Sequence, residues 1–319
     1  MKKNIKKCLL ILILFASFFI LTFLIKKKQS IKVCLCVIAK LENNYIRDFV
    51  AHYQKYKIDK IFLYDNNDVD GEKMELVLSE YISTNLVEIL NFRGINIKQK
   101  IIYQDCYTKN NQHFNWLLFY DVDEYIYMGN FKSIKDYLGQ FQFSNCECIY
   151  LNWMTYSDNN LMYYDNRTIF QRFTSSFKNR TYRTWGKSIL RGNITNITFG
   201  SVHTLYNKII RCDGKGNICR LRGYACNKPD FDNFFINHFI YRSTEEMVNK
   251  FNKGDCVFRG PGWWSIKLSK IFSYLNENEV SMLKISFIAK YAKIKKEKLI
   301  SLYKNKLIKE DYNFSHINK

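Results

Sequence analysis

Four short apolar segments, each separated from the next by one stretch of helical periodicity, dominate the first half of the chain. The segments begin near residues 31, 60, 86 and 116. Residues 45–56 illustrate the intervening helices, because their apolar side chains recur at three- and four-residue spacing. The other two helices are expected near residues 72–83 and 98–108. This alternation predicts an α/β fold with a Rossmann-like, mostly parallel sheet and right-handed crossovers.

The strand expected at residues 116–120 ends directly in three carboxylates, at Asp121, Asp123 and Glu124. In open α/β sheets, ligands bind beyond the carboxyl ends of the strands. Two aspartates spaced i, i+2 on a chain leaving a strand can both reach one cation, and their hard oxygen ligands suit Mn²⁺ or Mg²⁺. We therefore predict a metal site at Asp121 and Asp123 that carries a diphosphate.

The Asp-x-Asp tripeptide has little value by itself, since it also occurs at Asp68 and at Asp230. Those two copies lie among Asn, Gly and Pro, in sequence typical of turns, and no complete buried strand leads into them. The buried strand that precedes it is the reason to prefer the copy at Asp121 as the metal site.

Residues 8–25 contain no charged side chain and are flanked by lysines on both sides. That length suffices to cross a bilayer as a helix. A cleaved signal peptide is the alternative, but the apolar run is long for one and ends in lysines rather than at a small-x-small site. We expect a cytosolic tail at 1–7, a signal anchor at 8–25 and a lumenal remainder. The prediction is a single-pass type II membrane protein of the Golgi or endoplasmic reticulum.

The formal net charge of +20 invites a nucleic-acid interpretation. Many of these lysines flank the apolar run or lie in a basic segment at 261–319, which is expected to be helical. No helix-turn-helix, zinc-finger or RNA-recognition signature occurs, so we expect no nucleic-acid partner. An oxidising lumen would allow the ten cysteines to form disulfides. Cys212, Cys219 and Cys226 could pair among themselves or with Cys146, Cys148 and Cys256, and the sequence leaves these alternatives open.

Regular alternation fades beyond the acidic cluster. Ser133 is a candidate cap for a helix reaching Phe141, and Ser243 with Glu246 forms the pattern of a capping box. Further strands are expected at residues 147–153, 168–173, 187–190 and 234–240.

Four sequence blocks occur in order and together resemble glycosyltransferase family 92 and its family 2-like relatives. They are Cys-Val-Ile-Ala-Lys-Leu-Glu-Asn at 36–43, Tyr-Asp-Asn-Asn at 64–67, Asp-Val-Asp-Glu-Tyr at 121–125 and His-Phe-Ile-Tyr-Arg-Ser-Thr-Glu-Glu-Met-Val-Asn-Lys at 238–250. The resemblance implies a GT-A fold and a glycosyltransferase domain at about 31–260. Two departures are Leu41, where the family commonly has Asn, and residues 156–160, where a glycine-bearing loop is expected.

The resemblance implies inverting, metal-dependent transfer of a hexose from a nucleotide-sugar donor to a hydroxyl of a glycan or glycoprotein. Within the family the leaning is toward galactose and a UDP donor. The residues that match the family's donor site are Lys40, Glu42, Asp65, Asn66 and Lys250. For Asp65 an ordinary Asx turn is the alternative, and for Lys250 a solvated surface position.

Such enzymes often take a third metal ligand from a late histidine, and His238 and His203 are the candidates. We prefer His238, because the strand expected at 234–240 would carry it toward the acidic cluster. Asp158 and Asp165 are both candidates for the general base, and the sequence does not decide between them. Glu124 is expected to support the metal ligands. The alternative function is a catalytically inactive, membrane-anchored glycan-binding protein on the same fold.

Overall fold

The computed structural model describes residues 31–250, apart from 160, 162, 177–184, 223–224, 227–229, 244 and 247–249. The predicted anchor at 8–25 and the basic segment at 261–319 lie outside the described residues, and both stay predictions. No helix in the described part of the chain is long and apolar enough to span a membrane.

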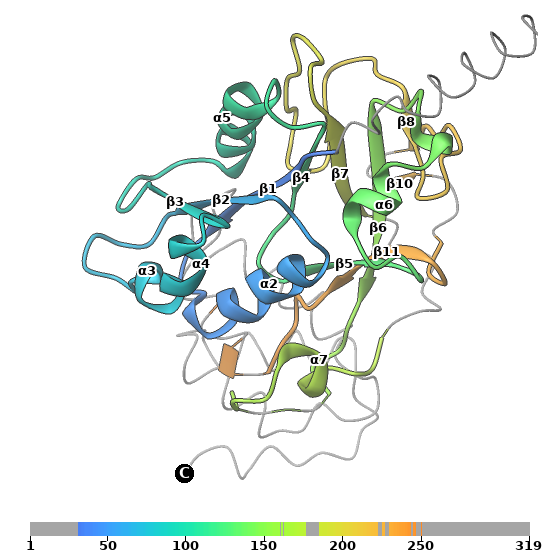
Figure 1. Cartoon of the computed structure of the whole chain (residues 1–319). Helices are drawn as coiled ribbons and strands as arrows, with labels where there is room; N and C mark the ends of the chain where they lie inside the picture. Colours follow the sequence, from blue (N-terminus) through green and yellow to red (C-terminus); the bar gives the residue numbers. More distant parts are fainter. Residues whose placement is uncertain are drawn as a thin grey trace, which may run out of the picture. The chain divides into compact units, whose positions relative to one another are not determined.

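A nine-stranded sheet runs through the described residues in the order β3-β2-β1-β4-β7-β6-β11-β5, with β8 paired to β6 (Figure 1). Its strands are β1 (Val33–Ala39), β2 (Lys60–Asp65), β3 (Val87–Asn91), β4 (Trp116–Phe119), β5 (Glu124–Met128), β6 (Cys148–Thr155), β7 (Gly186–Arg191), β8 (Arg211–Cys212) and β11 (Phe234–His238). Two short strands, β9 (Leu221–Arg222) and β10 (Ala225–Cys226), pair separately. The helices are α2 (Asn43–Lys55), α3 (Met74–Val77), α4 (Ser79–Ser83), α5 (Gln99–Asn110), α6 (Ile134–Leu138) and α7 (Ile169–Arg172), with a 3₁₀ turn at Phe141–Phe143.

The predicted parallel arrangement is confirmed for the first half of the sheet. Strand β1 lies parallel to both β2 and β4, and β2 lies parallel to β3. The second half is mixed, because β7 enters antiparallel between β4 and β6, and β5 pairs antiparallel with β11. The carboxyl ends of β1, β2 and β4 therefore lie along the same edge of the sheet. Strand β11 pairs with the carboxyl-terminal part of β6, and β5 pairs with β11.

Helices α2 and α5 bury the apolar faces that their sequences predict. In α2 the buried side chains include Ile46, Phe49 and Tyr53, and the Phe49 ring packs edge-on against Tyr125 of β5. In α5, Ile102 and Tyr103 lie in one cluster with side chains of β1, β2 and β4. Fully burying a large apolar side chain contributes about 1.5–3 kcal/mol, so these faces hold the helices on the sheet.

Several predicted elements differ from the structure. The strand expected at 168–173 is wrong: α7 forms there, because Thr168 and Gln171 make a complete capping box that satisfies the free amides of a helix start. The helix expected at 72–83 is split into α3 and α4. The Ser133 cap is confirmed, but α6 ends at Leu138 and a 3₁₀ turn follows. Strands β8, β9 and β10 were not predicted.

Two disulfides join distant parts of the described chain. Cys146–Cys212 is one of the pairings that the sequence left open, whereas Cys36–Cys106, between β1 and α5, was not predicted. Cys219 is also disulfide-bonded. Cys34 and Cys148 are buried free thiols.

Removing the Cys36–Cys106 bond tests how far it stabilises the packing of α5 on the sheet. The double variant Cys36→Ala with Cys106→Ala should lower the free energy of unfolding by roughly 2–5 kcal/mol, because the bond closes a long loop in the unfolded chain. Denaturant titration without reductant measures the change. Cys34→Ala is the matched control, since it removes a buried sulfur from the same strand without removing a cross-link. Equal losses for both variants would contradict a stabilising role for the bond.

Candidate active site

A tight connection between β4 and β5 carries the acidic cluster. The Glu124 amide donates to the Asp121 carbonyl at 2.9 Å, and the Phe239 amide donates to the Asp123 carbonyl at 2.9 Å. Glu124 then opens β5, where it is the direct antiparallel partner of His238 on β11. Directly opposed residues of an antiparallel pair point to the same face. The strand register therefore places the histidine beside the acids, as expected for His238.

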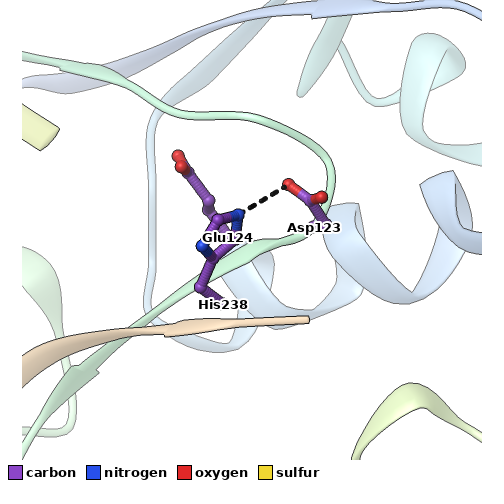
Figure 2. A group of neighbouring side chains, drawn as sticks. All are labelled: Asp123, Glu124 and His238. Carbon is purple, nitrogen blue, oxygen red and sulfur yellow. Dashed lines mark ion pairs between the residues drawn. The ribbon is translucent and has the colours of Figure 1, made fainter. Parts of the chain in front are cut away.

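Asp123, Glu124 and His238 form the candidate metal group (Figure 2). One ligand atom from each lies within 4.8 Å of the others, and all three residues are buried. The His238 Nε2 atom is 3.7 Å from Asp123 Oδ1. In the described part of the chain, Glu124 Oε1 and His238 Nδ1 are buried and have no hydrogen-bond partner. Such atoms are rare in folded proteins. The group offers two carboxylates and an imidazole, a set of ligands that fits a divalent cation such as Mn²⁺.

Electrostatics leave two of the three side chains in metal-binding forms at neutral pH. Burial raises the pKa of Asp123, but Lys250, His238 and Arg242 more than offset this and hold it below its ordinary range. Burial lowers the pKa of His238 to about 4, so the imidazole is neutral. Burial raises the pKa of Glu124 well above its ordinary value. A bound cation favours loss of that proton, since metal ligands must be deprotonated.

Asp121 faces a different set of partners. Its Oδ2 atom lies 3.0 Å from Lys187 Nζ, and its Oδ1 atom accepts hydrogen bonds from Tyr103, at 2.9 Å, and from Gln99. Burial raises the pKa of Asp121, but Lys187 offsets this and the pKa lies below its ordinary value. Its side chain is 33% exposed, which leaves it open to a ligand. Its part in holding a metal stays a prediction, because it lies outside the three-residue group.

Lys187 is a site residue that the sequence analysis did not single out. It lies on β7, is fully buried, and places Nζ 3.0 Å from Asp121 and 3.7 Å from Glu124. Burial lowers the pKa of Lys187, but these two acids raise it above its ordinary value. Buried lysines are rare unless paired. The available signal was a lysine inside an apolar strand.

Two further cations lie on the segment that follows β11. Lys250 Nζ is 2.8 Å from Asp123 Oδ2, so this residue of the predicted donor site does lie at the acidic cluster. Arg242 Nη1 is 2.8 Å from Glu42 Oε2, and its guanidinium lies 4.0 Å from the centre of the Tyr45 ring. Arg242 has a φ of 41°, which is an uncommon conformation for a residue with a side chain. Its Nε and Nη2 atoms are buried without a partner among the described residues.

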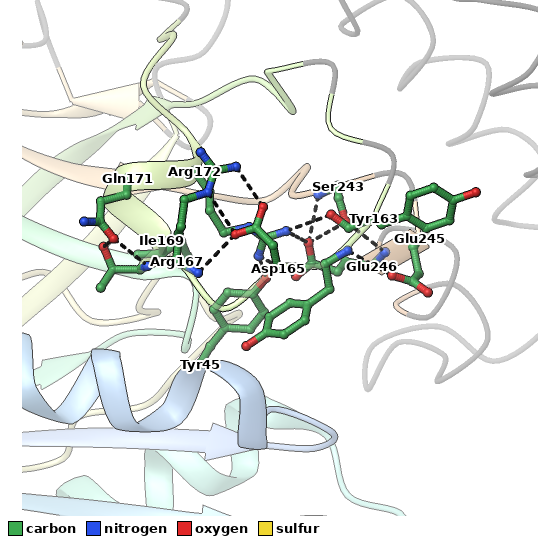
Figure 3. A network of polar contacts seen from close by, with 12 residues as sticks. Tyr45, Tyr163, Asp165, Arg167, Ile169, Gln171, Arg172, Ser243, Glu245 and Glu246 are labelled. Carbon is green, nitrogen blue, oxygen red and sulfur yellow. Dashed lines mark hydrogen bonds and ion pairs between the residues drawn. The ribbon is translucent and has the colours of Figure 1, made fainter.

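A buried polar network holds this segment in place (Figure 3). Arg172 of α7 donates to Glu246 Oε2 at 2.6 Å and also bonds the Tyr45 hydroxyl of α2. Ser243 and Glu246 form the predicted capping box. Burial raises the pKa of Glu246 to about 8. Because Arg172 is fully buried, breaking its pairing would leave an uncompensated charge.

Asp165 and Asp158, the candidate bases, lie in different surroundings. Asp165 is held by Arg167, which with a smaller contribution from Arg172 lowers the pKa of its exposed carboxyl to about 2. A carboxylate with that pKa is a weak base. Asp158 is buried just after β6, where the neighbouring Tyr156 amide donates to the His238 carbonyl at 3.0 Å.

The remaining predicted donor residues lie at the carboxyl ends of β1 and β2, at the same sheet edge. Lys40 Nζ lies 2.8 Å from Asp68. Asp65 forms an Asx turn by accepting from the Asn67 amide, and it also pairs with Arg93 at 2.8 Å. Asn66 donates to the carbonyls of Phe92 and Ile95.

His203 lies outside the candidate metal group. Its Nδ1 atom is 3.0 Å from the Gly186 carbonyl, and its ring packs against Trp153. This placement favours His238 over His203 as the histidine of the group.

The site thus combines an α/β sheet with two buried acids at the start of β5 and a histidine at the end of β11. The sequence profile of glycosyltransferase family 92 matches residues 29–283, which is more than half of the chain. The chain therefore belongs to glycosyltransferase family 92. The resemblance of the four sequence blocks is confirmed.

Matches to individual relatives cover only about a third of the chain. A glycosyltransferase family 92 protein of Arabidopsis thaliana is 29% identical over 111 residues, which cover 34% of this chain and 19% of that protein. Galactan beta-1,4-galactosyltransferase GALS1 of Arabidopsis thaliana is 27% identical over 103 residues, covering 30% of this chain and 21% of GALS1. The matched stretches thus span about a fifth of the length of these curated relatives.

Among solved structures, residues 1–349 of S. aureus TarS match with a TM-score of 0.37 and 10% identity. The match covers 90% of this chain and 74% of that chain. A TM-score this low does not establish a shared fold.

Metal titration tests the candidate metal group. Asp123→Asn and His238→Gln should each weaken Mn²⁺ binding by at least ~10-fold, because each removes one of three ligands. Isothermal titration calorimetry measures the change. Asp70→Asn is the matched control: it alters an exposed aspartate of another Asp-x-Asp tripeptide and should bind Mn²⁺ as the wild type does. Mn²⁺ affinity that is the same in all four proteins would exclude this group as the metal site.

A second prediction concerns Lys187 and pH. Lys187→Met removes the cation from two buried acids, so the free energy of unfolding at pH 7.5 should fall by about 3–5 kcal/mol. Without the lysine, the folded-state pKa of Glu124, which burial already raises, rises further, and that of Asp121 rises from its lowered value. A group whose pKa is raised by folding stabilises at low pH and loses that contribution as pH rises. The loss should therefore be smaller at pH 5.5 than at pH 7.5.

Urea titrations of wild type and variant at both pH values give this difference directly. Lys109→Met is the control, because Lys109 pairs with Asp105 on the surface of α5 and such pairs contribute no more than about 1 kcal/mol. A Lys187→Met loss that is the same at both pH values would show that the lysine does not compensate these acids.

Proposed function

We propose that the chain is a metal-dependent glycosyltransferase of the GT-A type, which moves a hexose from a nucleotide-sugar donor to a hydroxyl of a glycan. The observation that carries this proposal is the group of Asp123, Glu124 and His238 in a member of glycosyltransferase family 92. The group lies just beyond the carboxyl end of β4, where ligands of such sheets bind.

Breaking the bond between the sugar and the diphosphate builds negative charge on the leaving group. A divalent cation held by Asp123, Glu124 and His238 would offset that charge as a Lewis acid. Lys250, at 2.8 Å from Asp123, is placed to bind the same phosphates by charge-assisted hydrogen bonds. Arg242 adds positive charge nearby, since it helps to hold down the pKa of Asp123. Lys187 keeps the neighbouring acids in place.

Inverting transfer requires a base that takes the proton from the acceptor hydroxyl. Asp158 suits this role better than Asp165, because the turn that carries it hydrogen-bonds to His238 through the Tyr156 amide. Asp165 is engaged by Arg167 at 2.7 Å. We assign Asp158 as the base and Asp165 to the network that holds the segment after β11.

The donor in this proposal is UDP-galactose. The choice follows the family's leaning and the name of the relative GALS1, a galactan beta-1,4-galactosyltransferase. Lys40, Glu42, Asp65 and Asn66 would contact the nucleoside, because they lie at the carboxyl ends of β1 and β2, at the edge that also carries the acids.

We further propose that the protein acts as a type II membrane protein in the lumen of the Golgi or endoplasmic reticulum. The apolar run at 8–25 supplies the anchor. The disulfides Cys36–Cys106 and Cys146–Cys212 favour an oxidising compartment.

Release of UDP from UDP-galactose tests this function. The wild type should release UDP with Mn²⁺ and an oligosaccharide acceptor, and EDTA should abolish the release until Mn²⁺ is restored. Asp123→Asn should lower kcat/KM at least ~100-fold, because it removes a ligand of the group that offsets leaving-group charge. Asp70→Asn should remain as active as the wild type. Release that persists in EDTA, or that Asp123→Asn leaves unchanged, would contradict the proposal.

A further inference from the structure

Four rings pack one against the next, beginning at His238 of the candidate metal group. The Trp153 ring lies 4.1 Å from His238 and 5.1 Å from His203, measured between ring centres. Trp185 lies 5.3 Å from His203 and 6.2 Å from Trp153. We call these four residues the aromatic wall. It joins β11, β6 and the residue before β7 to the loop that carries His203.

Backbone contacts fix the aromatic wall in place. The Trp153 amide donates to the Trp185 carbonyl at 2.7 Å, and His203 Nδ1 lies 3.0 Å from the Gly186 carbonyl. Gly186 permits this close pairing of β6 and β7, because a Cβ there would lie 1.9 Å from the Leu151 carbonyl oxygen. The backbone that carries the two tryptophans, and the His203 ring, are therefore positioned before any ligand arrives, which lowers the entropy cost of binding.

The exposure of the aromatic wall changes along its length. Trp185 is 45% exposed at one end, Trp153 and His203 are half-buried, and His238 is buried at the other. Large apolar side chains such as Trp185 are usually more buried than this. Its exposure close to a buried polar group therefore indicates a binding surface. The wall thus leads from the surface to the three residues proposed to hold the cation.

We propose that the aromatic wall binds the apolar face of a hexopyranose ring. A pyranose presents C–H groups on its faces and hydroxyls around its rim, and the negative face of an aromatic ring complements those C–H groups. The Trp153 indole N–H is buried without a partner among the described residues and can donate to a rim hydroxyl. This inference rests on the proposed function. The ring could belong to the donor's sugar or to the acceptor's terminal sugar, and the experiment distinguishes the two.

Substitutions at Trp185 test the proposal in the whole chain. Trp185→Ala removes the exposed ring, Trp185→Phe keeps an aromatic face, and Phe141→Ala is the matched control because it removes an aromatic side chain that is 91% exposed in the 3₁₀ turn. Each variant is first shown to fold by its thermal unfolding. Calorimetric titrations then measure binding of β-1,4-galactotetraose, UDP-galactose and UDP with Mn²⁺ present.

Trp185→Ala should weaken binding of galactotetraose or of UDP-galactose by roughly three- to tenfold, while UDP binding stays unchanged. A loss for galactotetraose assigns the wall to the acceptor, and a loss for UDP-galactose alone assigns it to the donor's sugar. Trp185→Phe should retain most of the affinity, and Phe141→Ala should retain all of it. The proposal is overturned if Trp185→Ala binds both sugar ligands as the wild type does.

The galactotetraose titration is also run without metal or nucleotide. If the wild type binds galactotetraose under these conditions and Trp185→Ala binds it more weakly, the role of the aromatic wall is supported even when no UDP is released. The experiment therefore separates failure of this inference from failure of the proposed transferase activity. Failure of the wild type to bind galactotetraose or UDP-galactose in any condition would overturn the wall's role in binding these sugars.

Discussion

The antiparallel pairing of β5 with β11 is the contact on which the rest of the site depends. It sets Glu124 directly opposite His238, although the two residues are far apart in the chain. Side chains alternate between the faces of a strand, so a slip of one residue would turn His238 away from the acids. The same pairing brings the segment after β11 toward the site, and with it Arg242 and Lys250.

Charge balance is the second constraint, because three acids follow β4 and two of them, Asp123 and Glu124, are buried. A buried charge is costly unless it is paired and hydrogen-bonded. Lys187 forms ion pairs with Asp121 and Glu124, whereas Lys250 forms an ion pair with Asp123. The positive charges that stabilise the fold therefore surround the place where the proposed diphosphate would bind. Stability and function draw on the same contacts, so substitutions at Lys187 should affect both.

Sequence patterns predicted the parts of the molecule that depend on local order. The βαβ alternation gave the parallel half of the sheet, and the apolar run before Asp121 located the end of β4. His238 could be placed because an apolar run surrounds it. A lysine inside an apolar strand marked Lys187, but its pairing with two acids and the Cys36–Cys106 bond depend on contacts between distant segments, which no local pattern encodes. The short α7 was mistaken for a strand because its apolar residues are too few to show a period, while its capping box decides the structure.

The proposed function depends on the binding of one divalent cation by Asp123, Glu124 and His238. Its most direct test is a crystal structure of the protein grown with MnCl₂, with diffraction recorded on both sides of the manganese absorption edge. Cation binding by these residues predicts a single anomalous peak within bonding distance of Asp123, Glu124 and His238, about 2.0–2.3 Å. A peak elsewhere, or no peak while Lys250 still contacts Asp123, would contradict it.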